Sequence, residues 1–363
     1  AQAITSKKKG WRTYSPEKKH KEFGLNNLWD PVARAELCSS CHIGNVGEGK
    51  VVTHEMYAAG HPPLPGFEIQ TYSEAMPRHW EHLSEKIAKA QNYKGNEDFY
   101  TRIGYHDPKQ GDMEQTRMLV TSAVVAFRES VRLLGEAADD ALKNGKKLEW
   151  PEFALYDCYA CHHDLKSDSW RQKRGYLGTP GRPQMRPWSE ALMPLAIQHS
   201  GVTGKQADFD GQLKTLEQIL SKAPFGKEQD VRDATKKMID WSDELLTDMK
   251  KVAFDKDNSR KLLAGLVQRK PKEYLDWDGA RMVGWGLRTI LPELGQKSAV
   301  ERKEMKELED SLKLDFVKGQ KEIVGDYLNA YLLALSNHDP SQFRKTLSGL
   351  QDLVDGVPKK KAK

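Results

Sequence analysis

Two five-residue stretches in this chain combine the residue types that can hold a haem covalently. They read Cys38-Ser39-Ser40-Cys41-His42 and Cys158-Tyr159-Ala160-Cys161-His162. Two thiols on one turn of backbone can form a thioether with each of the two vinyl groups of haem, and the histidine that follows can bind the iron. The chain has 4 cysteines, and each pair is followed at once by histidine. The pattern therefore predicts two covalently bound haem c groups, attached through Cys38, Cys41, Cys158 and Cys161, with His42 and His162 as the proximal iron ligands.

Two other uses of these cysteines compete with the haem interpretation. A zinc site built from all the thiolates would use the same pairs but would leave His42 and His162 without a role. Disulfides would require each C-x-x-C pair to lie in the strand-to-helix setting of a thioredoxin-like site, which the flanking residues do not indicate. Haem attachment is the interpretation that gives every cysteine and histidine of both motifs a function.

The chemistry of each iron depends on its sixth ligand, opposite the proximal histidine. A second histidine gives a low-potential iron suited to electron transfer, methionine raises the potential, and an open position admits small molecules. We expect the distal ligands among His20, His54 and His61. On one helix, His54 and His61 would lie two turns apart, about 10 Å along the axis, so they cannot both be ligands of the same iron. Weaker candidates for the sixth ligand are His79, His82, His106, His199, Met56, Met76, Met113, Met118 and Met185. His163 directly follows a proximal ligand, and we expect it to contact the backbone or a propionate.

Local signals indicate how the segments around the motifs are built. Thr53 is a suitable N-cap for a short helix, which Gly60 and the prolines that follow would end. Apolar residues at three- and four-residue spacing over residues 113–143 predict a long buried helix that leads to the second motif. Beyond that motif, glycine and proline crowd residues 175–188 and predict an extended segment.

Helical periodicity continues through the second half of the chain, which holds no cysteine. Apolar stripes predict helices there, the last of them opened by Asp339 and Pro340. No stretch alternates with the period of two that a strand requires. We expect an all-α fold, with a dihaem cytochrome c domain with long loops over residues 1–198 and a C-terminal helical bundle over residues 199–363.

Bulk properties restrict the partners and the location of the protein. A length of 363 residues suits two domains, and the formal net charge is +5. Two haems would add about four propionates and bring the charge close to neutral, so we expect no nucleic-acid partner. No apolar run approaches the roughly 18 residues of a membrane span. The initial Ala-Gln-Ala fits signal-peptide cleavage, and covalent haem attachment follows export, so we expect a periplasmic or equivalent compartment.

Three segments carry a family resemblance: residues 38–44, residues 53–64, which read T-H-E-M-Y-A-A-G-H-P-P-L, and residues 156–165. With Trp170 and Trp188, they resemble multihaem c-type cytochromes of the nitrifier tetrahaem cytochrome and hydroxylamine oxidoreductase-like group. The nearest resemblance is to the dihaem subunit that partners an octahaem hydroxylamine oxidoreductase-like protein in anaerobic ammonium-oxidising bacteria. The resemblance covers residues 11–190, and the A-A-G-H-P stretch is its most specific part.

The resemblance implies a bis-histidine electron-transfer subunit in a hetero-oligomer with such a multihaem protein, exchanging electrons with small redox carriers as well. It places the protein in the anammoxosome lumen. It carries the haem roles over to Cys38, Cys41, His42, Cys158, Cys161 and His162, and it favours His20, His54 and His61 as distal ligands without assigning them to irons. This chain has two haem motifs where most of the group has more, which argues against conversion of nitrogen compounds within it.

Three functions fit these motifs. The first is an electron-transfer subunit in which both irons are six-coordinate and the second half of the chain serves a partner or a scaffold. The second is a dihaem peroxidase-like enzyme, in which one haem has an open site for peroxide. The third is a haem sensor. The spin state of the oxidised irons separates the first two, because full ligation predicts low-spin haem only.

Overall fold

The computed structural model describes residues 14–77, 82, 85, 112–145, 147–167, 169, 172, 181–223, 225–268, 276–314 and 333–355. These residues are mostly helical and contain no strand, and isolated antiparallel bridges join Asn45 to Lys50 and Tyr156 to Met185. The predicted all-α class is therefore confirmed. Within the same ranges, no helix has both the length and the apolar character that crossing a bilayer requires.

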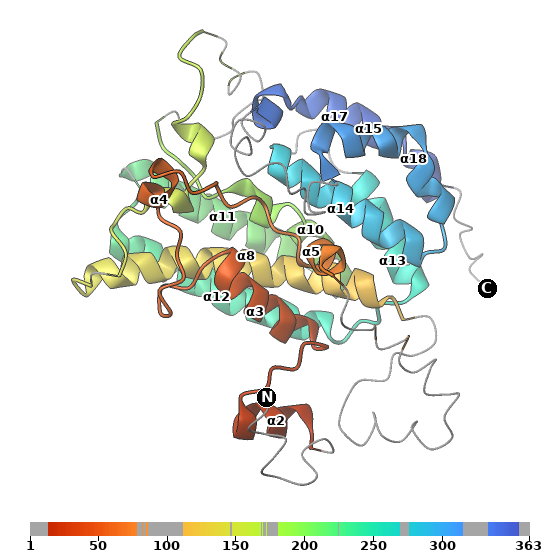
Figure 1. Ribbon diagram of the computed structural model, residues 1–363, viewed down its shortest axis with the longest axis horizontal. Helices are drawn as coiled ribbons and strands as arrows, with labels where there is room; N and C mark the ends of the chain where they lie inside the picture. The colour runs from red at the N-terminus through yellow and green to blue at the C-terminus, as the bar shows by residue number, and fades with distance from the viewer. Residues whose placement is uncertain are drawn as a thin grey trace.

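The α-helices follow one another along the chain with short 3-10 helices between some of them (Figure 1). The first half holds α2 (Pro16–Phe23), α3 (Pro31–His42), α4 (His54–Ala58), α5 (Ile69–Ala75), α8 (Glu114–Leu142), η2 (Phe153–Leu155), η3 (Cys158–Ala160), η4 (Pro187–Glu190) and α10 (Met193–Ser200). The second half holds α11 (Lys205–Lys222), α12 (Glu228–Met249), α13 (Lys256–Val267), α14 (Trp277–Glu293), η5 (Lys297–Glu301), α15 (Lys303–Leu312), α17 (Pro340–Ser348) and α18 (Gln351–Asp355).

Helix α8 is the element around which the others pack. It has 29 residues, is buried over most of its length, and confirms the long helix expected from the apolar spacing. Helices α3, α5, α10, α12 and α14 all contact it, so it joins elements from both halves of the chain (Figure 1). A helix that meets partners on several faces must be apolar nearly all round, as α8 is in its middle turns.

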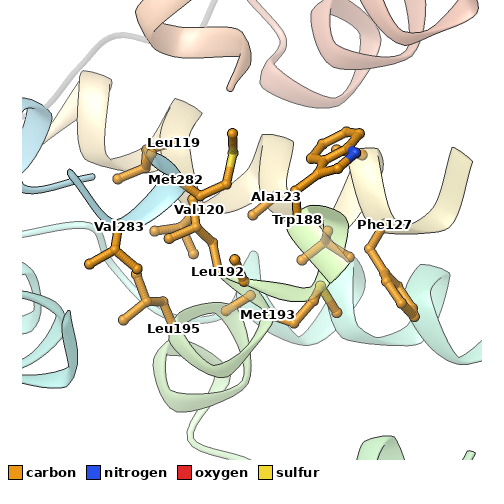
Figure 2. Close-up of a cluster of buried hydrophobic side chains, with 14 of the residues drawn as sticks. Leu119, Val120, Ala123, Phe127, Trp188, Leu192, Met193, Leu195, Met282 and Val283 are labelled. Carbon is orange, nitrogen blue, oxygen red and sulfur yellow. The ribbon is translucent and has the colours of Figure 1, made fainter. Parts of the chain in front are cut away.

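The core is formed where α8, α10 and α14 meet (Figure 2). Leu119, Val120, Ala123 and Phe127 of α8 face Leu192, Met193, Leu195, Met282 and Val283, with the Trp188 indole at one side (Figure 2). These side chains come from residues on both sides of the expected boundary at 198/199 and belong to one buried cluster. The division into two domains stays a prediction.

The apolar stripes predicted in the second half of the chain occupy buried helix faces. Phe209, Leu216 and Leu220 are buried on α11, and Met238, Trp241, Leu245 and Met249 are buried on α12. The Asp339 side chain caps α17 by accepting hydrogen bonds from the amides of Ser341 and Gln342, as expected, and Pro340 is the first helical residue. In the stripe predicted from Leu308 to Leu335, both of these end residues are buried, and its positions 316–331 lie outside the described residues.

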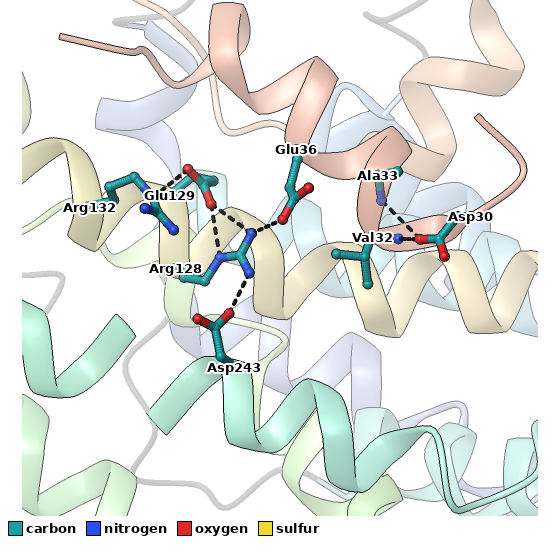
Figure 3. A network of polar contacts seen from close by, with 8 residues as sticks. All are labelled: Asp30, Val32, Ala33, Glu36, Arg128, Glu129, Arg132 and Asp243. Carbon is teal, nitrogen blue, oxygen red and sulfur yellow. Dashed lines mark hydrogen bonds and ion pairs between the residues drawn. The ribbon is translucent and has the colours of Figure 1, made fainter. Parts of the chain in front are cut away.

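A buried arginine fastens α3 to α8 and α12 (Figure 3). The Arg128 side chain on α8 is 6% exposed and its guanidinium contacts Glu36 on α3 at 2.5 Å, Asp243 on α12 at 2.5 Å and Glu129 at 2.9 Å. Arg132 contacts the same Glu129 at 3.0 Å. One guanidinium thus fixes the position of α3, the helix that carries the first C-x-x-C-H motif.

Candidate functional site

The first motif is the last turn of α3. Asp30 caps the helix by accepting hydrogen bonds from the Val32 and Ala33 amides at 2.9 and 3.0 Å, and Pro31 is the first helical residue. Cys38, Cys41 and His42 stand at positions i, i+3 and i+4, so all three lie on one face of the helix. This is the grouping that attachment of a single haem requires.

The chain leaves α3 through a glycine that the packing requires. Gly44 has a φ of +139°, and a side chain there would place its Cβ 3.0 Å from the Leu133 side chain and 3.1 Å from the Lys50 carbonyl oxygen. The Gly44 amide donates a hydrogen bond to the Ser39 carbonyl, and Asn45 and Lys50 then pair their backbones in a tight loop. The loop folds the following residues back toward α8.

His42 is held by aromatic residues that precede and belong to α5. Its imidazole stacks on Phe67 with ring centroids 4.0 Å apart and planes 5° apart, and Tyr72 meets it edge-on at 6.2 Å. Partial burial lowers the pKa of His42, which favours the neutral imidazole that binds a metal. Phe67 is placed by the next residue, Glu68, whose carboxylate caps α5.

A pocket opens beside His42. The space beside it is about 550 Å³, a volume that includes open solvent. The pocket is mostly apolar, and its lining comes from the first motif, from the segment around α4, from α8 and from the residues before and after the second motif. The lining residues are His42, Ile43, Val52, Tyr57, Leu64, Pro65, Ser130, Leu133, Ala154, Leu155, Met185, Arg186 and Trp188.

The second motif is a single helical turn. Cys158 to Ala160 form η3, and the amides of Cys161 and His162 both donate to the Cys158 carbonyl, at 3.2 and 2.8 Å. The turn is anchored on its N-terminal side, where Tyr156 pairs with Met185 and the Asp157 amide donates to the Gln184 carbonyl at 2.8 Å. Cys161 and His162 are exposed, so the second motif faces solvent more openly than the first.

Helix α4 brings His54 to the second motif. Thr53 caps the helix and Gly60, with a φ of +104°, follows its end, which confirms the predicted boundaries. The His54 amide donates to Glu152 at 2.7 Å, and the same carboxylate oxygen accepts from the Ala154 amide at 2.8 Å. Glu152 is buried, and its carboxylate therefore ties the start of α4 to the segment that leads into the second motif.

The rings of His54 and His162 have centroids 6.1 Å apart with an angle of 32° between their planes. A metal–imidazole bond is about 2.0–2.1 Å long and the ring centre lies about 1 Å behind its nitrogen, so two imidazoles on opposite sides of one metal have centroids about 6 Å apart. The observed spacing matches that arrangement. Among the three candidates for a distal ligand, His54 is the one whose ring contacts a proximal histidine.

His61 and His20 are placed differently. The His61 ring is exposed, lies 6.0 Å from Tyr57 of the pocket, and has its Nδ1 2.7 Å from the Pro62 carbonyl oxygen. His20 is exposed on α2, which lies beyond the N-terminal end of α3 in Figure 1, whereas His42 is at the other end of that helix. His54 and His61 therefore contact different residues.

The weaker candidates lie away from both motifs or contact other groups. His82 pairs with Glu74 at 3.1 Å, and this hydrogen bond raises the pKa of His82. His199 is buried and stacks on Phe254 at 3.7 Å, and His163 Nδ1 contacts the Asp164 carbonyl at 2.9 Å, the backbone contact expected for it. Met113 and Met118 are buried in the core, Met56 and Met76 are exposed, and Met185 lines the pocket. His79, His106 and Trp170 lie outside the described residues.

The four cysteines are free thiols in the structure, and none of them forms a disulfide. Burial raises the pKa of Cys38 and Cys158, so both are neutral thiols at neutral pH rather than thiolate ligands. In the described ranges, no group of three histidine, cysteine or carboxylate side chains could hold a metal ion. A haem iron needs only two protein ligands, because the porphyrin supplies the others, so a pair of histidines is enough for it.

Sequence reasoning did not find the residues that support the motifs. Phe67, Glu152 and Arg186 contribute to the site, but nothing in the sequence around Phe67 and Arg186 distinguishes these two from ordinary packing or surface residues. Glu152 carried the only local signal, because it stands just before a turn whose amide it caps. Comparisons with protein-family models, with curated proteins and with solved structures gave no match.

Proposed function

We propose that this protein is a dihaem c-type cytochrome that carries electrons to or from a multihaem redox enzyme through bis-histidine haems. The observation that supports it most strongly is the contact between His54 and His162, whose ring centroids lie 6.1 Å apart next to a C-x-x-C-H turn, so that both would be available to hold one iron. An iron with histidine on both sides has no open position and exchanges electrons without binding substrate.

Each haem, when bound, supplies a one-electron iron couple, and the chain supplies attachment and orientation. Cys38 and Cys41 would hold one haem and Cys158 and Cys161 the other, with His42 and His162 as proximal ligands. Phe67 fixes the orientation of the His42 ring by stacking on it. Glu152 positions His54 through the backbone of α4.

The proposal extends to organisation and partners. Residues 1–198 would form the dihaem domain and residues 199–363 a helical bundle that docks or supports a partner. The partner we propose is a multihaem hydroxylamine oxidoreductase-like protein in a hetero-oligomer, in a periplasmic or equivalent compartment such as the anammoxosome lumen. The exposure of Cys161 and His162 supports electron exchange with another protein, because it leaves the second haem near the surface.

Electron paramagnetic resonance and absorption spectra of the oxidised holoprotein test the ligation. The unaltered protein should contain low-spin ferric haem only. His54→Ala should convert one of the two haems to high spin, and His163→Ala, its matched control beside the second motif, should leave both low-spin. His61→Ala and His20→Ala identify the sixth ligand of the other iron. A His54→Ala protein with two unchanged low-spin haems contradicts the assignment.

A dihaem peroxidase-like enzyme is the second candidate. The observation that favours it is that His42, among the described residues, has ring contacts with Phe67 and Tyr72 and no histidine ring opposite, next to a mostly apolar pocket. An open sixth position at that iron would admit peroxide. High-spin ferric haem in the unaltered protein, together with turnover of hydrogen peroxide, would support the enzyme and overturn the electron-transfer proposal.

A further inference from the structure

A residue from the second half of the chain packs beside the second motif. Phe225 lies between α11 and α12, and its ring centroid is 5.1 Å from that of Phe153 and 5.1 Å from that of Tyr156, with interplanar angles of 57° and 66°. Centroids about 4.5–7 Å apart with inclined planes are typical of favourable aromatic pairs. Phe153 and Tyr156 both precede Cys158, so Phe225 packs on the segment that leads into the motif.

Phe153 connects Phe225 to the candidate distal ligand. The Phe153 ring meets the His54 imidazole edge to face, with centroids 5.5 Å apart and planes at 84°. Phe153 directly follows Glu152, whose carboxylate accepts the His54 amide at 2.7 Å. Because Phe153 is 47% exposed, the position of its ring depends on the side chains on which it packs, Phe225 among them. The Phe225 ring therefore supports the ring that contacts His54.

Tyr156 connects Phe225 to the proximal side of the same site. The Tyr156 side chain is buried, and its hydroxyl donates a hydrogen bond to the Phe225 carbonyl at 3.3 Å. Burial raises the pKa of Tyr156 well above its ordinary value, so the phenol keeps the proton that it donates. The backbone of Tyr156 pairs with Met185 two residues before Cys158. Phe225 thus contacts this anchored segment with both its ring and its carbonyl.

The backbone of Phe225 has a conformation that bulky residues rarely adopt. Its φ is +66°, and that of Gly226, which follows, is +78°. A large side chain in the left-handed region persists where the surrounding structure holds it there, and such residues often lie at functional sites. A Cβ on Gly226 would lie 2.7 Å from the Val231 side chain and 3.2 Å from that of Ile219, so the backbone here lies tightly on α11 and α12. The two helices therefore fix the direction in which the Phe225 ring points.

We propose that Phe225 is a positioning residue of the second haem site, where it keeps the His54 ring in place for the iron through Phe153. Through Tyr156 it also holds the segment before Cys158 beside α4. The proposal rests on the proposed function, because it needs a haem at the second motif with His54 as its distal ligand. It adds that the second half of the chain takes part in ligation. Groups that orient a metal ligand strengthen its binding, so loss of the Phe225 ring should make His54 easier to displace.

Cyanide binding to the oxidised holoprotein, with both haems attached, measures how firmly His54 is held. Cyanide competes with a distal histidine for ferric iron, so its apparent affinity rises with the fraction of iron that the histidine has left. Phe225→Leu should raise the cyanide affinity of the haem that His54→Ala converts to high spin by about two- to tenfold, as expected for the loss of one aromatic pair. Tyr156→Phe, which removes the hydrogen bond to the Phe225 carbonyl, should raise it by less. The matched control is Phe209→Leu on α11, whose ring pairs with two aromatic rings of the core at 5.2 and 5.5 Å, and it should leave the affinity unchanged.

Phe225→Gly separates the effect of the ring from that of the backbone, because glycine adopts a φ of +66° readily. It should raise the cyanide affinity as Phe225→Leu does, and it decides the question if Phe225→Leu does not fold. Unchanged affinity in either variant overturns the proposal, and so does an equal rise in Phe209→Leu, which would indicate a general loosening of the fold. A failure of the proposed function differs from these results, because it would appear as missing haem in the unaltered protein or as two unchanged low-spin haems in His54→Ala.

Discussion

Replacing Arg128 with alanine should destabilise the protein, because it removes the contacts that join α3, α8 and α12. The guanidinium is 6% exposed and makes charge-assisted contacts with Glu36, Asp243 and Glu129 from three helices. Hydrogen bonds to charged groups contribute about 1.5–3 kcal/mol each. The Glu36 and Asp243 side chains are 47% and 53% exposed and regain water when the arginine is lost, so their contacts count at the low end. The expected loss in the free energy of unfolding is about 2–4 kcal/mol.

Urea unfolding followed by far-ultraviolet circular dichroism measures this loss. The matched control is Arg132→Ala, one helical turn further along α8, whose side chain is 39% exposed and pairs with Glu129 at 3.0 Å. It should cost about 0–0.5 kcal/mol, as exposed pairs do. Arg128→Lys keeps the charge but cannot reach three carboxylates at once, and it should fall between the two. If Arg128→Ala is no less stable than Arg132→Ala, the guanidinium does not hold the three helices together.

Two further predictions concern packing and pH. A Cβ at Gly135 on α8 would overlap the Thr235 hydroxyl on α12, so Gly135→Ala should lower the free energy of unfolding by about 1–2 kcal/mol, although alanine has the better helix propensity. Adding Thr235→Ala should restore the stability. The control is Gly211→Ala on α11, where a Cβ meets nothing within 4 Å and should stabilise the helix. Burial lowers the pKa of His199 to about 4. Below pH 6.5 the unfolded chain therefore binds a proton that the folded chain does not bind. About 2–3 kcal/mol of the free energy of unfolding should be lost between pH 6.5 and pH 4. Unfolding melts of His199→Phe should lack this part of the pH dependence, and equal slopes in both proteins would contradict it.

Local features of the site were predictable because they depend on residues close in sequence. The i, i+3, i+4 spacing of Cys38, Cys41 and His42 requires only one helical turn, and that turn is present. Thr53 and Gly60 delimit α4 through their own backbone preferences. The long apolar pattern of α8 predicts burial on several faces for the same reason.

Relations between distant residues could not be predicted from the same patterns. His54 meets His162 because Glu152, 98 residues further along the chain, accepts the His54 amide. Phe67 stacks on His42 because α5 packs on α8, which no periodicity specifies. Among His20, His54 and His61, the sequence offered no reason to prefer one, and the pairing depends on how α4 docks beside the second motif.

Intact mass spectrometry of the denatured protein from an oxidising, haem-supplying host tests the central claim most directly. Covalent haem at both motifs predicts a mass above that of the polypeptide by two haem groups, and Cys158→Ala combined with Cys161→Ala should leave one. A mass equal to the bare polypeptide, or one that the double substitution leaves unchanged, would contradict attachment at both motifs and with it the function proposed for this chain.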